Sequence, residues 1–181
     1  MKKILYFLFI MASCLTWTSC NKNEWDNNNS EMEHIYYFGF QDWGDRKNKV
    51  TFNVKQGETL EIPVQFWSEY IRSYDVIAFY YTAGKLVLNK DYQVLDDSGN
   101  PISPDETGAY IMKWDKAVKG VKNIHIKAMN GAKGSFNVLT FNPNASTPIS
   151  ASDVASTTNN KTNAYEVRAF SQNYKVTVNI K

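Results

Sequence analysis

The chain has 181 residues with 20 basic and 18 acidic side chains, so its formal net charge is only +2. No run or stripe of lysine and arginine is present, which argues against a nucleic-acid-binding protein. The two cysteines, Cys14 and Cys20, both precede the bulk of the chain, so a disulfide framework is not expected.

Residues 1–19 have the order of a cleavable lipoprotein signal peptide. Lys2 and Lys3 form a short positive segment, and the apolar run Ile4–Ile10 follows it. This run is shorter than the roughly 20 residues that a membrane-spanning helix needs. We therefore expect export and processing. Loss of the two lysines leaves 18 basic and 18 acidic side chains, so the expected mature protein is close to neutral.

Two cysteines compete as the lipidated residue. Lipoprotein signals place small residues just before this cysteine and a leucine-like residue at the third position back. Cys20 follows two small residues but has Trp17 at that position, whereas Cys14 has Met11 there. Lipidation at Cys14 shortens the apolar segment, while lipidation at Cys20 places polar chain directly after the lipid. We predict lipidation at Cys20.

Residues 20–33 are predicted to form a polar tether. The stretch that follows Cys20, NKNEWDNNNSEME, is rich in asparagine and charge, and Trp25 is its only large apolar residue. It has no hydrophobic periodicity, so it lacks the pattern of a packed element. Its expected role is to space the following domain from the membrane.

Residues 34–181 carry a pattern of successive strands. Apolar and polar residues alternate with a period of two over 50–55, 60–66, 123–128 and 174–180. Residues 35–40 and 76–81 are apolar on both faces, which predicts more central strands. Turn-forming sequences separate the pieces at 56–58, 83–85, 97–101 and 130–134. About eight to ten strands in one domain predict an all-β fold, an antiparallel two-sheet sandwich.

Two features interrupt this pattern. Pro63 lacks an amide donor, so its strand is expected to have an edge or a bulge at that position. Residues 145–163 are rich in serine, threonine and asparagine and exceed the usual length of a hairpin loop. Loops of this length are usually functional or disordered, and the sequence does not choose between these alternatives.

No motif typical of a catalytic centre or a metal site is found. Neither His34 nor His125 has another histidine or cysteine at the spacing of a zinc site. Asp96 begins an EF-hand-like alternation, but Pro101 and Thr107 stand where that loop needs glycine and glutamate. Spacing alone leaves a carboxylate pair of the glycosidase kind open. Because the acidic residues lie mostly in turns, we expect a protein that is not an enzyme and uses no cofactor.

Aromatic residues are the positive feature, with 5 Trp, 11 Tyr and 10 Phe in the chain. Aromatic rings pack against the C–H faces of sugars much as they pack on one another in protein cores. Most are expected in the core, but Trp43 lies in a polar, turn-like stretch. Trp67 follows Phe66, so one of the two faces outward if the strand continues. Trp43 and Trp67 are the predicted ligand-binding residues.

Two resemblances add to this interpretation. The lysines, Ser19-Cys20 and the polar stretch Asn21–Asp26 resemble the N-terminus of small lipoproteins of the Bacteroidetes. In that group, an acidic, polar stretch behind the cysteine accompanies export to the outer face of the outer membrane. The resemblance implies a lipid-anchored, outer-membrane protein exposed at the cell surface.

Residues 50–181 resemble Calx-beta-like domains, which are immunoglobulin-like sandwiches. The motifs that carry this resemblance are Val54–Thr59, Asn89–Tyr92, Phe136–Pro143 and Val176–Ile180. The resemblance implies an immunoglobulin-like fold with an expanded loop before the last strands. Calcium is not carried over, because calcium-binding members have acidic residues after the closing strand, where this chain has Asn179-Ile180-Lys181.

These observations favour a non-catalytic surface lipoprotein that binds a glycan or supports a glycan-uptake or adhesion complex. The alternative is a structural or assembly subunit that packs on a larger outer-membrane partner without a ligand of its own. The expected partners are the membrane, through the lipid anchor, and either a glycan or an outer-membrane protein; nucleic acid is not expected.

We predict that Cys20→Ala abolishes lipid attachment and leaves an uncleaved or soluble protein, because the thiol is the point at which the lipid is attached. Metabolic labelling with a fatty acid measures this directly. Cys14→Ala is the matched control and should be labelled like the wild type. Labelling that persists in Cys20→Ala and disappears in Cys14→Ala would show that Cys14 is the anchor.

Overall fold

A computed structural model describes residues 33–41, 48 and 50–181 of the protein. The predicted signal peptide and all but the last residue of the predicted tether lie outside these residues, as do Cys20 and Trp43. The chain from Ile35 to Lys181 forms one compact unit. No helix in the described part of the chain is long and apolar enough to cross a bilayer.

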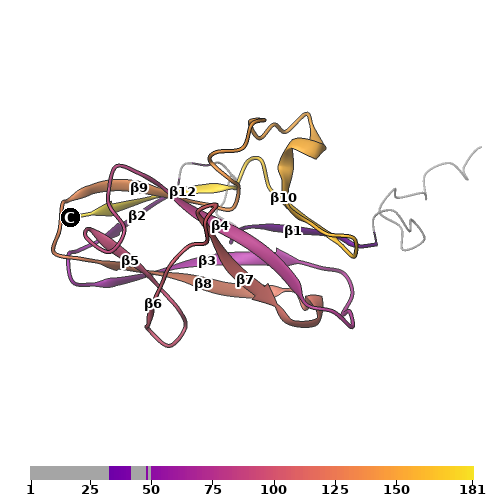
Figure 1. Ribbon diagram of the computed structural model, residues 1–181, viewed down its shortest axis with the longest axis horizontal. Coiled ribbons are helices and arrows are strands. Elements are labelled where there is room, and N and C mark those ends of the chain that lie inside the picture. Colours follow the sequence, from indigo (N-terminus) through magenta and orange to yellow (C-terminus); the bar gives the residue numbers. More distant parts are fainter. Residues whose placement is uncertain (1–32, 42–47, 49) are drawn as a thin grey trace, which may run out of the picture. The chain divides into compact units, whose positions relative to one another are not determined.

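The described chain is all-β, with twelve strands in two sheets (Figure 1). The seven-stranded sheet has the order β10-β11-β1-β3-β8-β5-β6 and the five-stranded sheet the order β2-β12-β9-β4-β7. The bounds of the first seven strands are β1 Ile35–Phe40, β2 Thr51–Val54, β3 Thr59–Trp67, β4 Val76–Gly84, β5 Tyr92–Leu95, β6 Pro101–Ile102 and β7 Ala109–Trp114. The others are β8 Gly120–Ala128, β9 Gly134–Leu139, β10 Thr158–Lys161, β11 Glu166–Ala169 and β12 Lys175–Ile180. Two short 3-10 turns, η2 Asp115–Ala117 and η3 Val154–Thr157, interrupt the strands.

The two-sheet, all-β architecture predicted from the sequence is confirmed, with two differences in detail. The described residues hold twelve strands rather than eight to ten, because β6 has only two residues and β10 lies within the segment 145–163. Two strand pairs, β1 with β11 and β2 with β12, are parallel rather than antiparallel. Parallel neighbours need a long connection, and most of the chain lies between the members of each pair.

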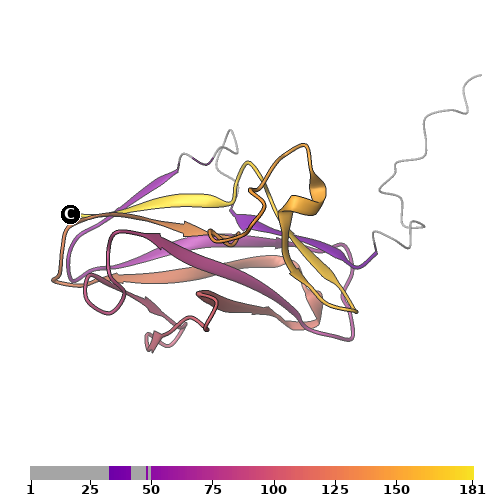
Figure 2. The ribbon, with the colours of Figure 1, turned by 45° about the horizontal axis from the view of Figure 1, so that its top comes forward.

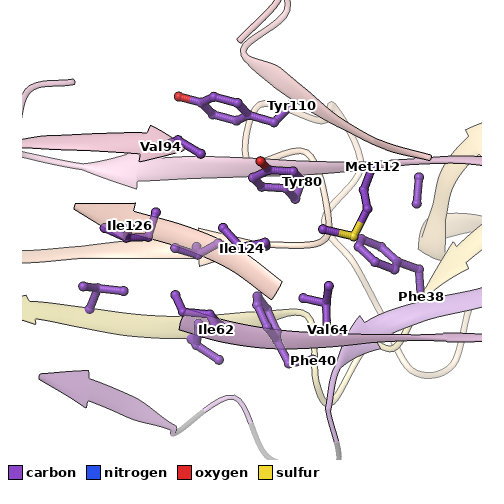
Figure 3. Packing of buried hydrophobic residues seen from close by; sticks show 14 of the residues in the cluster. Phe38, Phe40, Ile62, Val64, Tyr80, Val94, Tyr110, Met112, Ile124 and Ile126 are labelled. Carbon is purple, nitrogen blue, oxygen red and sulfur yellow. The ribbon is translucent and has the colours of Figure 1, made fainter. Parts of the chain in front are cut away.

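The core lies between the two sheets and follows from the alternation of the strands (Figure 3). Ile62, Val64 and Phe66 of β3 are fully buried, whereas the residues between them, Pro63 and Gln65, are half-buried. From the other sheet, Trp114 at the end of β7 stacks on Phe66, with ring centroids 4.9 Å apart and planes at 13°. Facing apolar rows of this kind hold two sheets together as a sandwich.

Of the edge or bulge expected at Pro63, the structure has the edge: there is no bulge, but the pairing of β3 with β1 does not extend past Val64. β3 lies between β1 and β8, and its register with β8 is continuous across Pro63. The proline is tolerated because β1 pairs with β3 only as far as Val64. Just beyond that point the Pro63 carbonyl accepts the backbone N–H of Gln41 at 2.9 Å, so the ladder on this side ends where the donor is missing.

The first half of β4 lacks a strand neighbour on one side. β7 pairs with residues 76–81 of β4, but β9 pairs only with residues 81–84. The side chain of Asn159 in β10 fills this place. Its Oδ1 accepts the N–H of Phe79 at 2.9 Å, and its Nδ2 donates to the carbonyls of Phe79 and Thr140, both at 2.7 Å.

Two further side chains form hydrogen bonds with the backbone of Ile77 in the same way. The Ile77 N–H donates to the Tyr165 hydroxyl at 3.0 Å, and Asn160 Nδ2 donates to the Ile77 carbonyl at 2.8 Å. The backbone of the β10–β11 hairpin therefore belongs to the seven-stranded sheet (Figure 2). Its side chains form hydrogen bonds with the five-stranded sheet. The last part of segment 145–163 has a structural role, which the sequence left open.

We expect Asn159→Ala to lower the free energy of unfolding by about 2–4 kcal/mol, because it removes three hydrogen bonds and leaves backbone groups of β4 without a partner. Chemical denaturation monitored by tryptophan fluorescence measures the loss. Asn163→Ala is the matched control, since Asn163 is exposed in the turn between the same two strands, and it should change stability by less than about 0.5 kcal/mol. Equal stability of the two variants would contradict this role of Asn159.

Candidate functional site

Trp67, which the sequence singled out, lies at the end of β3 on the outer face of the seven-stranded sheet. The alternation that buries Phe66 turns the neighbouring Trp67 outward, where it is half-buried. Its ring packs edge-to-face on Phe170, with centroids 4.7 Å apart and planes at 73°. Phe170 follows β11, so two distant parts of the chain meet here.

A glycine makes room for this aromatic contact. Gly39 of β1 is buried, and a Cβ placed on it would lie 3.1 Å from Cδ2 of Phe170 and 3.2 Å from the Asn173 carbonyl oxygen. Tyr37, two residues earlier on the same face and directly opposite Trp67 in the β1–β3 pairing, also packs on Phe170, with ring centroids 5.3 Å apart. The ring of Phe170 thus lies over the bare backbone of Gly39 and contacts the rings of both Tyr37 and Trp67.

The loop after Phe170 is fixed by two asparagines. Asn173 is 5% exposed, and its Nδ2 donates to the Phe40 carbonyl at 2.7 Å. Asn48 binds the loop twice, because its Nδ2 donates to the Ser171 carbonyl at 3.1 Å and its Oδ1 accepts the N–H of Lys175 at 2.9 Å. These bonds hold the loop in one conformation before any ligand binds.

Together these residues form a cleft of about 210 Å³, lined by Trp67, Phe170, Ser171, Gln172 and Asn173. Two aromatic rings supply apolar surface, and a hydroxyl and amides supply hydrogen-bond donors and acceptors. None of the lining side chains in the described part of the chain is charged. This chemistry suits a neutral ligand with both C–H faces and hydroxyl groups, and it provides no acid, base or nucleophile pair.

The other tryptophans either belong to the core or lie outside the described residues. Trp114 is buried and part of the core, with Lys122 Nζ 5.2 Å from its ring centroid. Trp43 lies outside the described residues, as does Trp25 of the tether. The role of Trp43 therefore stays a prediction of the sequence.

Another polar cluster surrounds His125. His125 lies between Asp97, with Nε2 to Oδ1 at 3.3 Å, and Glu61, with Nδ1 to Oε1 at 3.9 Å. Among residues 33–41, 48 and 50–181, no three histidine, cysteine or acidic side chains are grouped to hold a metal ion. Asp96 instead binds its own turn, accepting N–H groups from Ser98 and Asn100, and these hydrogen bonds lower the pKa of its carboxyl.

Comparison with models of known protein families gives no match, and comparison with curated proteins gives none either. Similarity therefore assigns no ligand to this cleft, and its chemistry is the basis for a functional assignment.

Sequence reasoning missed Phe170, the partner of Trp67. A signal was present, because Val167 and Ala169 alternate as inward residues and Phe170 then stands before the polar run Ser171-Gln172-Asn173. The position of Phe170 over β1 depends on the parallel pairing of β1 with β11. No local pattern in either strand predicts that pairing.

We expect Asn173→Ala to destabilise the protein by about 1–3 kcal/mol, because it leaves the buried Phe40 carbonyl without its side-chain donor. It should also raise the hydrogen-exchange rates of residues 170–175, which the bond holds in place. Thermal unfolding and exchange mass spectrometry measure the two effects. Gln172→Ala, on the exposed side of the same loop, is the control and should be neutral in both.

Proposed function

We propose that the protein is a non-catalytic surface lipoprotein that binds a glycan in the cleft formed by Trp67 and Phe170. The observation that carries this proposal is a cleft whose described lining residues are uncharged, with aromatic rings beside hydroxyl and amide groups. A sugar presents an apolar C–H face to a ring and hydroxyls to such polar groups. Neutral lining residues favour a neutral saccharide over an anionic one.

Export and membrane attachment are part of the same proposal. Residues 1–19 act as the signal peptide, and Cys20 carries the lipid that anchors the protein to the outer membrane with its domain at the cell surface. Residues 20–33 then give the domain reach beyond the membrane. A glycan-binding domain on such a tether supports a glycan-uptake or adhesion complex.

We further propose that the domain is immunoglobulin-like and related to Calx-beta domains. Seven strands, taken in chain order as A to G, are β1, β3, β4, β5, β8, β9 and β12. Their spatial order, β1-β3-β8-β5 in one sheet and β4-β9-β12 in the other, supports this proposal, because it corresponds to the ABED and CFG sheets of immunoglobulin constant domains.

The resemblance around Asp91-Tyr92 also has a structural counterpart. The Asp91 side chain is 3% exposed and accepts the N–H groups of Val87 and Ala132, at 2.8 and 2.7 Å. These two hydrogen bonds lower the pKa of its carboxyl and join the loops before β5 and after β8. Gly131 is required beside it, since a Cβ there would overlap an Asp91 carboxylate oxygen.

We expect Trp67→Ala to weaken glycan binding by about ten- to a hundredfold, the usual loss on truncating a central aromatic contact. The ligand is first identified on a glycan array, and its affinity is then measured by calorimetry. Trp67→Phe keeps a ring and should retain part of the affinity. Trp43→Ala, tested beside it, decides whether the second predicted tryptophan contributes.

Stability separates a site residue from a core residue. Trp67 is half-buried, so its alanine variant should stay folded, whereas Trp114→Ala should cost about 3–5 kcal/mol because that ring fills the core. Unchanged glycan affinity in a folded Trp67→Ala variant would contradict this site. A wild-type protein that retains no glycan on the array would instead favour the structural or assembly subunit.

A further inference from the structure

Large exposed apolar side chains gather at one end of the sandwich. The described residues include seven of them. Three lie in two neighbouring connections, β3–β4 and η2–β8, and a fourth, Val121, lies at the start of β8. Tyr70 and Ile71, which are 37% and 72% exposed, lie in the first connection. Val118 and Val121, which are 45% and 47% exposed, lie in or just after the second. We call these four side chains and the two connections the apical surface.

The two connections form one surface because they are bonded to each other. The Arg72 N–H donates to the Lys116 carbonyl at 2.7 Å, and the Lys116 N–H donates to Asp75 Oδ1 at 2.9 Å. Lys113 strengthens this connection between the two segments, since its Nζ lies 2.8 Å from Asp75 Oδ2 and 3.1 Å from Asp115 Oδ1. Exposed apolar side chains are thus held in place rather than left on separate loops.

The backbone of the second connection is strained. Lys116 and Ala117 have φ angles of 51° and 53°, in the left-handed region that residues with a Cβ disfavour. Ala117 is completely buried, whereas Lys116 before it and Val118 after it are exposed. The fold tolerates this strain in a turn that leaves an apolar and a basic side chain in solvent.

The apical surface carries a small excess of positive charge. Counted with η2 and Lys113, its two connections hold four basic side chains and three acidic ones, which are Arg72, Lys113, Lys116 and Lys119 against Glu69, Asp75 and Asp115. Asp75 and Asp115 are both engaged by Lys113, so they are partly neutralised. Lys116 and Lys119 are exposed on either side of Val118. Basic side chains around exposed apolar ones are the combination that binds the surface of an anionic membrane.

The chain enters the domain at this same end. Tyr37 of β1 pairs with Trp67 of β3, and Phe66 pairs with Gly120 of β8, so the start of β1 lies beside the ends that carry the two connections. The C-terminal end of β12 lies at the opposite end of the sandwich (Figure 1). Residues 21–34, which separate Cys20 from β1, span at most about 50 Å when fully extended.

We propose that the apical surface docks on the anionic lipid headgroups of the membrane that holds the lipid anchor. This inference rests on the proposed lipidation of Cys20. A short tether keeps the apical surface at a high local concentration near the bilayer, so weak contacts suffice to dock it. Lys85 and Lys133 are also exposed, but they lie at the far end, away from the point where the tether enters.

The test uses the full chain, produced in a lipidating host and reconstituted into vesicles with one phosphatidylglycerol for about every three phosphatidylethanolamines. Val118→Cys or Ala132→Cys provides the only free thiol of the mature protein for an environment-sensitive fluorophore. Ala132 is exposed at the far end. We expect a quencher carried by the lipid headgroups to reduce fluorescence several-fold more at position 118 than at position 132.

Charge variants test the lipid contact itself. Lys116→Gln with Lys119→Gln should lower the docked population by about tenfold, whereas the matched pair Lys85→Gln with Lys133→Gln should leave it unchanged. Equal quenching by neutral phosphatidylcholine vesicles would overturn the assignment to anionic headgroups.

Two failures are distinguishable. A protein that floats with the vesicles but is quenched equally at positions 118 and 132 overturns the docking and leaves the lipid anchor intact. A chain that acquires no lipid, as shown by fatty-acid labelling, overturns the anchor and the docking with it.

Discussion

The half-paired edge of β4 is the constraint from which much of the remaining architecture follows. A strand in a two-sheet core cannot leave the N–H and C=O groups of Ile77 and Phe79 without partners, because buried backbone groups without hydrogen bonds are costly. The protein satisfies them with the amides of Asn159 and Asn160 and the hydroxyl of Tyr165. These side chains thus form the hydrogen bonds that a neighbouring strand would otherwise form, and the β10–β11 hairpin joins the two sheets.

The β10–β11 hairpin also explains why a cleft forms on the outer face of the seven-stranded sheet. Once β10 is fixed against β4, β11 lies parallel to β1 and delivers Phe170 to the surface above Gly39. Asn173 and Asn48 then hold the chain as it turns into β12. The aromatic contact between Phe170 and Trp67 is therefore a consequence of how the sandwich is closed, and the proposed glycan site is as rigid as that closure.

The structure uses aromatic and apolar residues in two different ways. Between the sheets, rings such as Phe66 and Trp114 stack without solvent and stabilise the fold. At the cleft and at the apical surface, apolar side chains are held partly or largely in solvent by hydrogen bonds to backbone groups nearby. Exposing apolar surface on a fixed framework lowers the ordering cost of binding, whether the partner is a sugar or a bilayer. A flexible loop with the same residues lacks this advantage.

The sequence alone determined which residues face the core, because alternation with a period of two is local: Ile62, Val64 and Phe66 had to share a face, and Trp67 had to lie on the other. It also determined the two-sheet, all-β architecture, since many short amphipathic strands bury their apolar faces in this way. Only the tertiary structure decided that β11 pairs with β1, that Asn159 serves β4, and that Phe170 meets Trp67. These contacts join residues some 80 to 130 positions apart. They are made by backbone groups, which every residue has, and by side chains of types that occur at many positions. The local sequence pattern therefore does not predict these contacts.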